Sequence, residues 1–234
     1  MPQQIRVGVI GTGGISRSQC KNLAAIDGVE VVAGADVSED ALSSFAEQFE
    51  CEHTFTDYTD LVKLEDLDAV TVCTPNFLHA DPTIAALEAG KHVMVEKPMA
   101  MNAEEAQAMV DAAEEAGKTL TIGFQWRLGP QAQTIKQYYD EGRLGDVMYA
   151  RVQTLRRRGI PSWGVFGRKD LQGGGPLIDI GVHLMETAHY LMGEPKPVAA
   201  SANTWTYLGD QEPTTPGQWG KWDHTTYTVE DLAV

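Results

Sequence analysis

Apolar runs alternate with amphipathic segments along the first half of the chain. Runs rich in Val and Ile predict strands at residues 5–10, 29–35, 69–74, 92–95 and 119–122, with a short extra strand around 53–55. Apolar residues at the helical period predict helices over residues 16–25, 41–49 and 81–89, and another between a cap at Asn102 and a stop at Gly117. Since the strands are apolar on both faces, we expect a doubly wound parallel α/β sheet of the Rossmann type.

The pattern changes after Gly123. Pro130 opens a helix that runs to about residue 140, and a glycine-rich loop precedes a second helix over residues 178–192. Three β-rich runs, at residues 147–155, 198–206 and 225–234, predict an open sheet. We therefore expect a dinucleotide-binding-type domain over residues 1–123 and an α+β domain over residues 124–234. The last run carries no turn signal, so we expect a fragment of a longer chain whose second sheet is incomplete.

The charge balance narrows the possible partners. Lys and Arg number 18 against 33 Asp and Glu, a formal net charge of -15, which repels nucleic acid and anionic membrane surfaces. An anionic ligand would therefore have to bind at a locally positive feature, such as a helix N-terminus or a single cationic side chain. The chain has three cysteines without C-x-x-C spacing, which indicates a reducing compartment. It also has no basic and apolar leader and no apolar run long enough to cross a membrane. These features predict a cytoplasmic protein.

A glycine-rich turn follows the first predicted strand. Residues 11–16 read Gly-Thr-Gly-Gly-Ile-Ser, which fits G-x-G-x-x-G except that Ser16 replaces the third glycine, and Asp36 follows 20 residues later at the end of the second strand. This context favours dinucleotide binding over a mere tight turn. Asp36 would accept hydrogen bonds from a ribose and repel a 2′-phosphate, so we expect NAD rather than NADP. The alternative for Asp36 is a solvated loop carboxylate.

Two more turns end central strands at the same predicted edge. Thr74-Pro75-Asn76 combines a residue that stops a strand with an amide that can both donate and accept. In Glu96-Lys97-Pro98, the proline biases Lys97 toward an extended backbone that could aim its ammonium into a cleft. An ordinary turn and a surface lysine are the alternatives.

Asp179 and His183 form a possible acid/base pair in the second half. They are four residues apart on a predicted helix, just after the glycines at 173–175, and a carboxylate beside an imidazole stabilises its protonated form and orients its ring. A core or surface histidine is the alternative. We predict no metal site, since H-E-x-x-H and clustered cysteines are absent from the sequence.

The order of these motifs, together with Gly-Gly-Gly-Pro-Leu-Ile-Asp-Ile-Gly-Val-His at residues 173–183, resembles the Gfo/Idh/MocA oxidoreductase family. The resemblance covers nearly the whole chain and includes an arginine near the start of the second domain, matched by Arg127. It implies hydride transfer between a nicotinamide and a secondary alcohol carbon of a sugar, cyclitol or related polyol. It also implies a cis Lys97–Pro98 peptide and oligomerisation through the C-terminal sheet.

The resemblance assigns catalysis to Lys97, Asp179 and His183. Lys97 would stabilise a developing alkoxide, His183 would exchange the hydroxyl proton, and Asp179 would orient and tune the pair. Asn76 and His79 would lie near the nicotinamide end of the cofactor. The full set expected to bind the cofactor is Gly11, Thr12, Gly13, Gly14, Ile15, Asp36, Thr74, Pro75, Asn76, His79, Glu96 and Lys97.

Two other functions remain open on this fold. A regulator could bind NAD and sense its redox state without catalysis, although such a protein has no need of Lys97, Asp179 and His183 together. An NAD-dependent glycosidase is the third possibility, since such enzymes also resemble the family and begin by oxidising a sugar hydroxyl.

Overall fold

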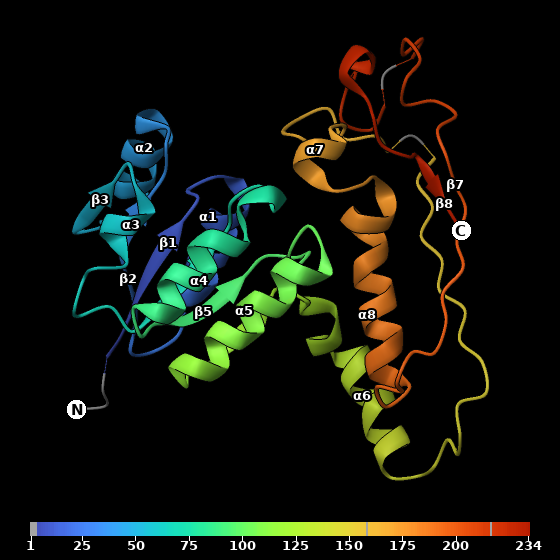
Figure 1. The fold of residues 1–234 in the computed structure, drawn as a ribbon, viewed down its shortest axis with the longest axis horizontal. Coiled ribbons are helices and arrows are strands. Elements are labelled where there is room, and N and C mark those ends of the chain that lie inside the picture. The colour runs from blue at the N-terminus through green and yellow to red at the C-terminus, as the bar shows by residue number, and fades with distance from the viewer. Residues whose placement is uncertain (1–3, 158, 216) are drawn as a thin grey trace. The chain divides into compact units, whose positions relative to one another are not determined.

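The computed structural model describes residues 4–157, 159–215 and 217–234, and its internal contacts divide the chain into two units, Met1–Gly123 and Phe124–Val234. The first unit is a six-stranded sheet in the order β3-β2-β1-β4-β5-β6, in which every neighbouring pair is parallel (Figure 1). Its strands are β1 (Ile5–Ile10), β2 (Val29–Ala35), β3 (His53–Phe55), β4 (Ala69–Val72), β5 (His92–Val95) and β6 (Leu120–Ile122). The predicted doubly wound α/β sheet is confirmed.

Helices connect these strands and cover the sheet. They are α1 (Gly14–Leu23), α2 (Glu39–Phe49), the short α3 (Tyr58–Leu61), the 3-10 turn η1 (Asn76–Leu78), α4 (Ala80–Glu88) and α5 (Ala103–Ala116). The α3 and η1 turns were not predicted, because runs of three or four residues are too short to show a helical period. The predicted cap and stop of α5 are present: Asn102 Oδ1 accepts from the Glu105 N–H at 2.9 Å, and Gly117 ends the helix with φ +61°.

The hydrophobic core of this unit lies on both faces of the sheet. Val9 and Ile10 are adjacent in β1 and therefore point to opposite faces. Val9 packs with Cys20 of α1 and Phe45 of α2, whereas Ile10 belongs to the larger cluster that includes Leu87 of α4 and Met109 of α5. The helices α4 and α5 lie side by side on that face (Figure 1). Burial on both faces explains why the strands read as continuous apolar runs.

The regular elements of the second unit are mainly helices, and long irregular segments connect them in the described residues. It contains η2 (Gln125–Leu128), α6 (Pro130–Asp140), α7 (Lys169–Gln172), a π-helical turn η3 (Leu177–Gly181), α8 (Val182–Leu191) and η4 (His224–Thr226). The helices α6 and α8 pack against each other (Figure 1). Two antiparallel strands, β7 (Thr204–Trp205) and β8 (Leu232–Ala233), complete it. The helix expected over residues 178–192 is thus a π-helical turn followed by an α-helix.

The sheet of this unit is small in the described chain, where it consists of β7 and β8. Residues 147–155 form no strand, and the runs at 198–206 and 225–234 contribute two strand residues each. Side chains in the first run are exposed, Met148 at 90% and Tyr149 at 78% of their surface. A strand forms only when a second backbone completes its ladder of hydrogen bonds, and β propensity in one segment cannot supply that partner.

Candidate functional site

The strand order brings four predicted motifs to one edge of the first sheet. The order reverses between β1 and β4, because β2 and β3 extend to one side and β5 and β6 to the other. Such a switch point leaves a crevice outside the carboxyl ends of the strands. The ends are held in register there: the Gly11 N–H donates to Ala35 O at 2.8 Å, Cys73 N–H to Ile10 O at 2.7 Å, and Glu96 N–H to Val72 O at 2.9 Å.

The glycines of the turn after β1 serve different purposes. Gly11 has φ +88°, and a Cβ there would lie 2.8 Å from backbone atoms of Cys73 and Thr74. Gly11 is therefore required by the fold itself. Gly13 and Gly14 are exposed, and a Cβ on either would meet no described atom within 4 Å beyond its own helix and neighbours. Packing within the chain gives no reason for glycine at these two positions.

The N-terminus of α1 fits an anionic group. Gly13 occupies the cap position, and no described side chain caps the helix there. The first turn therefore directs backbone N–H groups and the positive end of the helix dipole toward the space beside Gly13 and Gly14. Ser16, at the place of the third motif glycine, is buried and donates its hydroxyl to Gly13 O at 2.8 Å. The turn thus fits the pyrophosphate of a dinucleotide.

Asp36 holds this turn as well as marking the end of β2. Its Oδ2 accepts from the N–H and the hydroxyl of Thr12 at 2.7 and 3.0 Å, and its Oδ1 accepts from the Ser38 N–H at 2.9 Å. Thr12 is fully buried, so its side chain holds the turn in place by its hydrogen bond to Asp36 and does not present a surface to a ligand. Ile15 is half exposed beside the turn. Sequence reasoning assigned Asp36 to a ribose, and the structure adds a role in fixing the loop.

A partly buried polar network supports the turn after β5. Gln19 of α1 donates its Nε2 to Glu96 Oε1 at 2.5 Å, and its Oε1 accepts from the Thr71 hydroxyl at 2.5 Å. Glu96 Oε2 accepts from the Lys97 N–H at 3.2 Å, and burial raises the pKa of the Glu96 carboxyl. Sequence reasoning missed Gln19 and Thr71; a threonine inside the apolar run 69–73 was the available signal. The Lys97–Pro98 peptide is cis, as expected.

The turn after β4 lies partly beneath this edge. Asn76 is largely buried in η1, and the Thr74 hydroxyl donates to Leu78 O at 2.7 Å across Pro75. His79 has no exposed surface, and its ring nitrogens lie 2.7 Å from Pro98 O and 2.9 Å from Thr74 O. The structure therefore places His79 under the turns, against the protein's own backbone, rather than on a surface that would contact a nicotinamide.

The second unit carries Asp179 and His183 on either side of a change in helix type. Asp179 lies in the π-helical turn η3, 3.8 Å from an Arg156 guanidinium nitrogen, and lines a cavity of about 50 Å³. His183 lies in α8, is largely buried, and stacks on Trp126 with ring centroids 4.8 Å apart. Sequence reasoning missed the contacts of Arg156 and Trp126. The predicted shared face of one regular α-helix is replaced by this π/α junction.

Arg127 links two helices of the second unit. Its Nε donates to Glu186 of α8, its Nη1 lies 3.6 Å from Glu194, and its guanidinium stacks 4.7 Å above the Tyr190 ring. These contacts join η2 to α8, so Arg127 supports the helix that carries His183.

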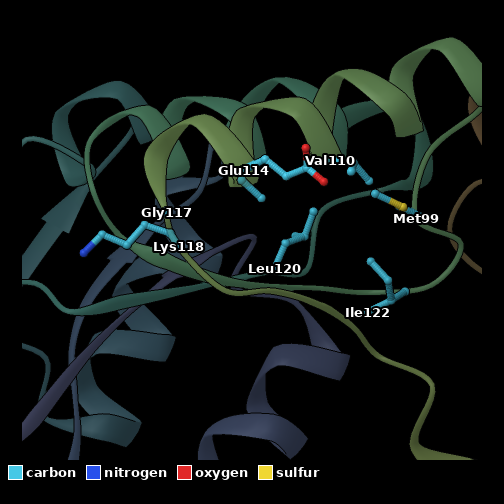
Figure 2. A pocket seen from close by; sticks show the side chains of 8 residues that line it. Met99, Val110, Glu114, Gly117, Lys118, Leu120 and Ile122 are labelled. Atoms are coloured by element: carbon cyan, nitrogen blue, oxygen red, sulfur yellow. The ribbon is translucent and has the colours of Figure 1, made fainter.

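Other features of the described chain do not add to this site. A groove of about 510 Å³ runs between α5 and β6 of the first unit and is lined by Met99, Val110, Ala113, Glu114, Gly117, Lys118, Leu120 and Ile122 (Figure 2). It includes none of the candidate residues. No helix in the described ranges is long and apolar enough to cross a membrane. Among the same residues, no cluster of His, Cys, Asp and Glu side chains could hold a metal ion.

Comparison with known families decides the identity of both units. A family model described as an oxidoreductase family with an NAD-binding Rossmann fold matches residues 5–124, and a GFO/IDH/MocA C-terminal domain model matches residues 132–233. This chain belongs to the Gfo/Idh/MocA family. The fold and the family expected from the sequence are confirmed, and the first unit is the NAD-binding Rossmann domain of that family.

Several known proteins of this family are similar to the chain. D-glucoside 3-dehydrogenase of Escherichia coli (strain K12) is 38% identical over 228 residues, which is 97% of this chain and 64% of that protein. Levoglucosan dehydrogenase of Pseudarthrobacter phenanthrenivorans (strain DSM 18606 / JCM 16027 / LMG 23796 / Sphe3) is 32% identical over 216 residues, 87% of this chain and 55% of that protein. A structure of levoglucosan dehydrogenase in complex with NADH superposes with a TM-score of 0.81 at 28% identity, covering 99% of this chain and 62% of the other. This chain thus spans less than two thirds of the length of these relatives.

Proposed function

We propose that the protein transfers a hydride between NAD(H) and the secondary alcohol or ketone carbon of a sugar, cyclitol or related polyol. The observation that carries the proposal is the uncapped N-terminus of α1 beside side-chain-free Gly13 and Gly14, at the sheet edge where Lys97 follows β5. The relatives support it, because they are named as dehydrogenases of a glucoside, levoglucosan and inositol.

The residues would divide the work as follows. Backbone N–H groups at residues 13–15 would bind the pyrophosphate, and Asp36 would face the adenosine ribose while holding Thr12. Bound NAD supplies a hydride acceptor, which the side chains of this chain lack. Lys97 would stabilise negative charge on the substrate oxygen, and His183 would exchange the hydroxyl proton. Asp179 would orient and tune this pair, with Arg156 holding its carboxylate.

The experiment is the change in nicotinamide absorbance when the protein is mixed with NAD or NADP and pooled cyclitols, aldoses and anhydrosugars. We expect reduction of NAD by wild type, and loss of at least about 100-fold in Lys97→Met because one charge-stabilising group in an active site contributes on this scale. Lys63→Met is the matched control, since Lys63 is exposed and its ammonium pairs with Asp60, which is not a candidate residue. Retained turnover in Lys97→Met, with NADH still bound, would contradict the assigned role.

The same assay separates the two other functions considered above. Tight NADH binding with no turnover of any pooled substrate would favour the redox-sensing regulator. Cleavage of a glycoside without net reduction of NAD would favour the glycosidase.

We also propose that the protein self-associates through its second unit and works in a reducing, cytoplasmic location. The first point is supported by the exposed apolar side chains of Met148, Leu155 and Val198, which are 90%, 73% and 96% accessible. The second is supported by the free thiols of Cys20, Cys51 and Cys73. Light scattering during size-exclusion chromatography and cell fractionation test the two points.

A further inference from the structure

His79 connects the two turns that carry Asn76 and Lys97. It lies between η1 and α4 with no exposed surface. Its Nδ1 is 2.7 Å from Pro98 O, in the turn after β5, and its Nε2 is 2.9 Å from Thr74 O, in the turn after β4. One side chain therefore spans two loops that are separate in sequence.

The chemistry of the two contacts makes them unequal. A carbonyl oxygen only accepts, and a neutral imidazole has one N–H to donate. Burial lowers the pKa of His79, and the charge of Lys97 lowers it further, although hydrogen bonding to the two carbonyls opposes this shift. A neutral ring can thus satisfy one carbonyl and must present a lone pair to the other.

Local hydrogen bonds indicate which carbonyl depends on the ring. The turn after β4 holds itself together, because the Leu78 N–H donates to Pro75 O at 2.8 Å and the Thr74 hydroxyl donates to Leu78 O at 2.7 Å. Pro98 follows Lys97 directly, has no N–H of its own, and makes the shorter of the two contacts with His79. The Pro98 carbonyl is therefore the better partner for the single N–H.

We propose that His79 is a positioning residue whose Nδ1–H, donated to Pro98 O, sets the backbone that presents Lys97 to the substrate. This rests on the proposed function, in which Lys97 stabilises the substrate oxygen. It differs from the role implied by the family resemblance, which counted His79 among the residues near the nicotinamide end of the cofactor.

Three substitutions separate the two ring nitrogens. His79→Asn keeps an amide donor near the place of Nδ1, His79→Gln keeps one near the place of Nε2, and His79→Leu keeps neither. We expect His79→Asn to retain kcat within about threefold of wild type. His79→Gln and His79→Leu should lose about 10- to 100-fold in kcat, the scale on which misplacing a catalytic group by about 1 Å lowers a rate. The Kd for NADH should change less than threefold in all three.

Two outcomes of the kinetics would overturn the inference. Equal kcat for all three variants and wild type would show that the bond is not needed, and loss of NADH binding in His79→Asn would show that the residue serves the cofactor site instead. A Lys97→Met variant measured beside them distinguishes the two proposals. If wild type turns over no substrate, the proposed function fails. If Lys97→Met turns over like wild type, the assigned role of Lys97 fails and this inference fails with it. If Lys97→Met is inactive while the His79 variants are normal, this inference alone fails.

A measurement on the unmodified protein keeps the inference testable if the variants do not fold. The ¹⁵N chemical shifts of His79 report which ring nitrogen carries the proton. We expect a protonated Nδ1 and an unprotonated Nε2 at neutral pH. A protonated Nε2 would assign the hydrogen bond to Thr74 O and overturn the proposed link to Lys97.

Discussion

Alanine at Gly11 should lower the stability of the fold, whereas alanine at Gly13 should weaken cofactor binding. Gly11 has φ +88°, and its added Cβ would lie 2.8 Å from the backbone of Cys73 and Thr74. At Gly13, in contrast, the added Cβ would meet no described atom within 4 Å beyond its neighbours. The two substitutions add the same methyl group at positions two residues apart in one turn, so they form a matched pair.

The magnitude for Gly11→Ala follows from two costs and one gain. A side chain in the left-handed region costs about 1–2 kcal/mol, and displacing packed neighbours costs about 1–3 kcal/mol. The smaller conformational freedom of alanine in the unfolded chain offsets about 0.4–1 kcal/mol. We expect a net destabilisation of roughly 2–4 kcal/mol. With about 2.1 cal/mol/K of unfolding entropy per residue, a unit of this size should lose roughly 4 °C in Tm for each kcal/mol.

Gly13→Ala should leave the fold nearly unchanged and weaken NADH binding. Gly13 is the cap residue of α1 with φ -72°, a value that alanine adopts freely. Replacing a glycine cap by alanine costs roughly 0.5–1 kcal/mol, and the smaller conformational freedom of alanine in the unfolded chain offsets about 0.4–1 kcal/mol of this cost. Its Cβ would occupy the space through which the backbone approaches the pyrophosphate. We expect the Kd for NADH to rise at least about tenfold while Tm changes by less than about 2 °C.

The assay can follow each unit separately. All five tryptophans lie after Gly123, so their fluorescence reports unfolding of the second unit, whereas far-UV circular dichroism also follows the first. NADH binding is measured by its own fluorescence on the folded proteins. A Gly11→Ala variant that melts like wild type would refute the steric argument. A Gly13→Ala variant that binds NADH like wild type would refute the placement of the pyrophosphate beside α1.

Two further predictions concern Asp36 and the thiols. Asp36→Asn keeps an acceptor for Thr12 but removes the negative charge, so the ratio of NADP turnover to NAD turnover should rise at least about tenfold. Asp36→Ala should also lower Tm, because the buried Thr12 N–H loses its partner at a cost of about 1–3 kcal/mol. Unchanged NADPH binding in both variants would count against this role of Asp36. Burial raises the pKa of Cys51 to about 11 and the pKa of Cys20 and Cys73 to about 12, so at pH 8 iodoacetamide should label the native thiols at least about 100-fold more slowly than the unfolded chain. The stability that these protonated thiols contribute should be lost as pH rises from about 9 through 11–12. Rapid labelling of the native protein would contradict the burial of the thiols.

Local patterns were sufficient for the first unit. Its strands are buried on both faces, so each reads as an apolar run whatever its neighbours are. The cap at Asn102 and the stop at Gly117 each act within a single turn of helix. The glycine turn, Asp36 and Lys97 could be found for the same reason, because each immediately follows one of these runs. Parallel pairing then requires them to share an edge, which the sheet order confirms.

Only the tertiary structure determined those features that depend on a residue distant in sequence. The apolar run at residues 147–155 forms no strand, since its propensity does not provide a second backbone. His79 is buried beneath the turns because Thr74 and Pro98 come together around it, and Gln19 reaches Glu96 across 77 positions of sequence. Sequence by itself determined which residues carry chemical groups at the ends of strands. The packing of non-local backbone carbonyls and side chains determined which of these residues are exposed at the sheet edge and which are buried beneath it and hold the others in place.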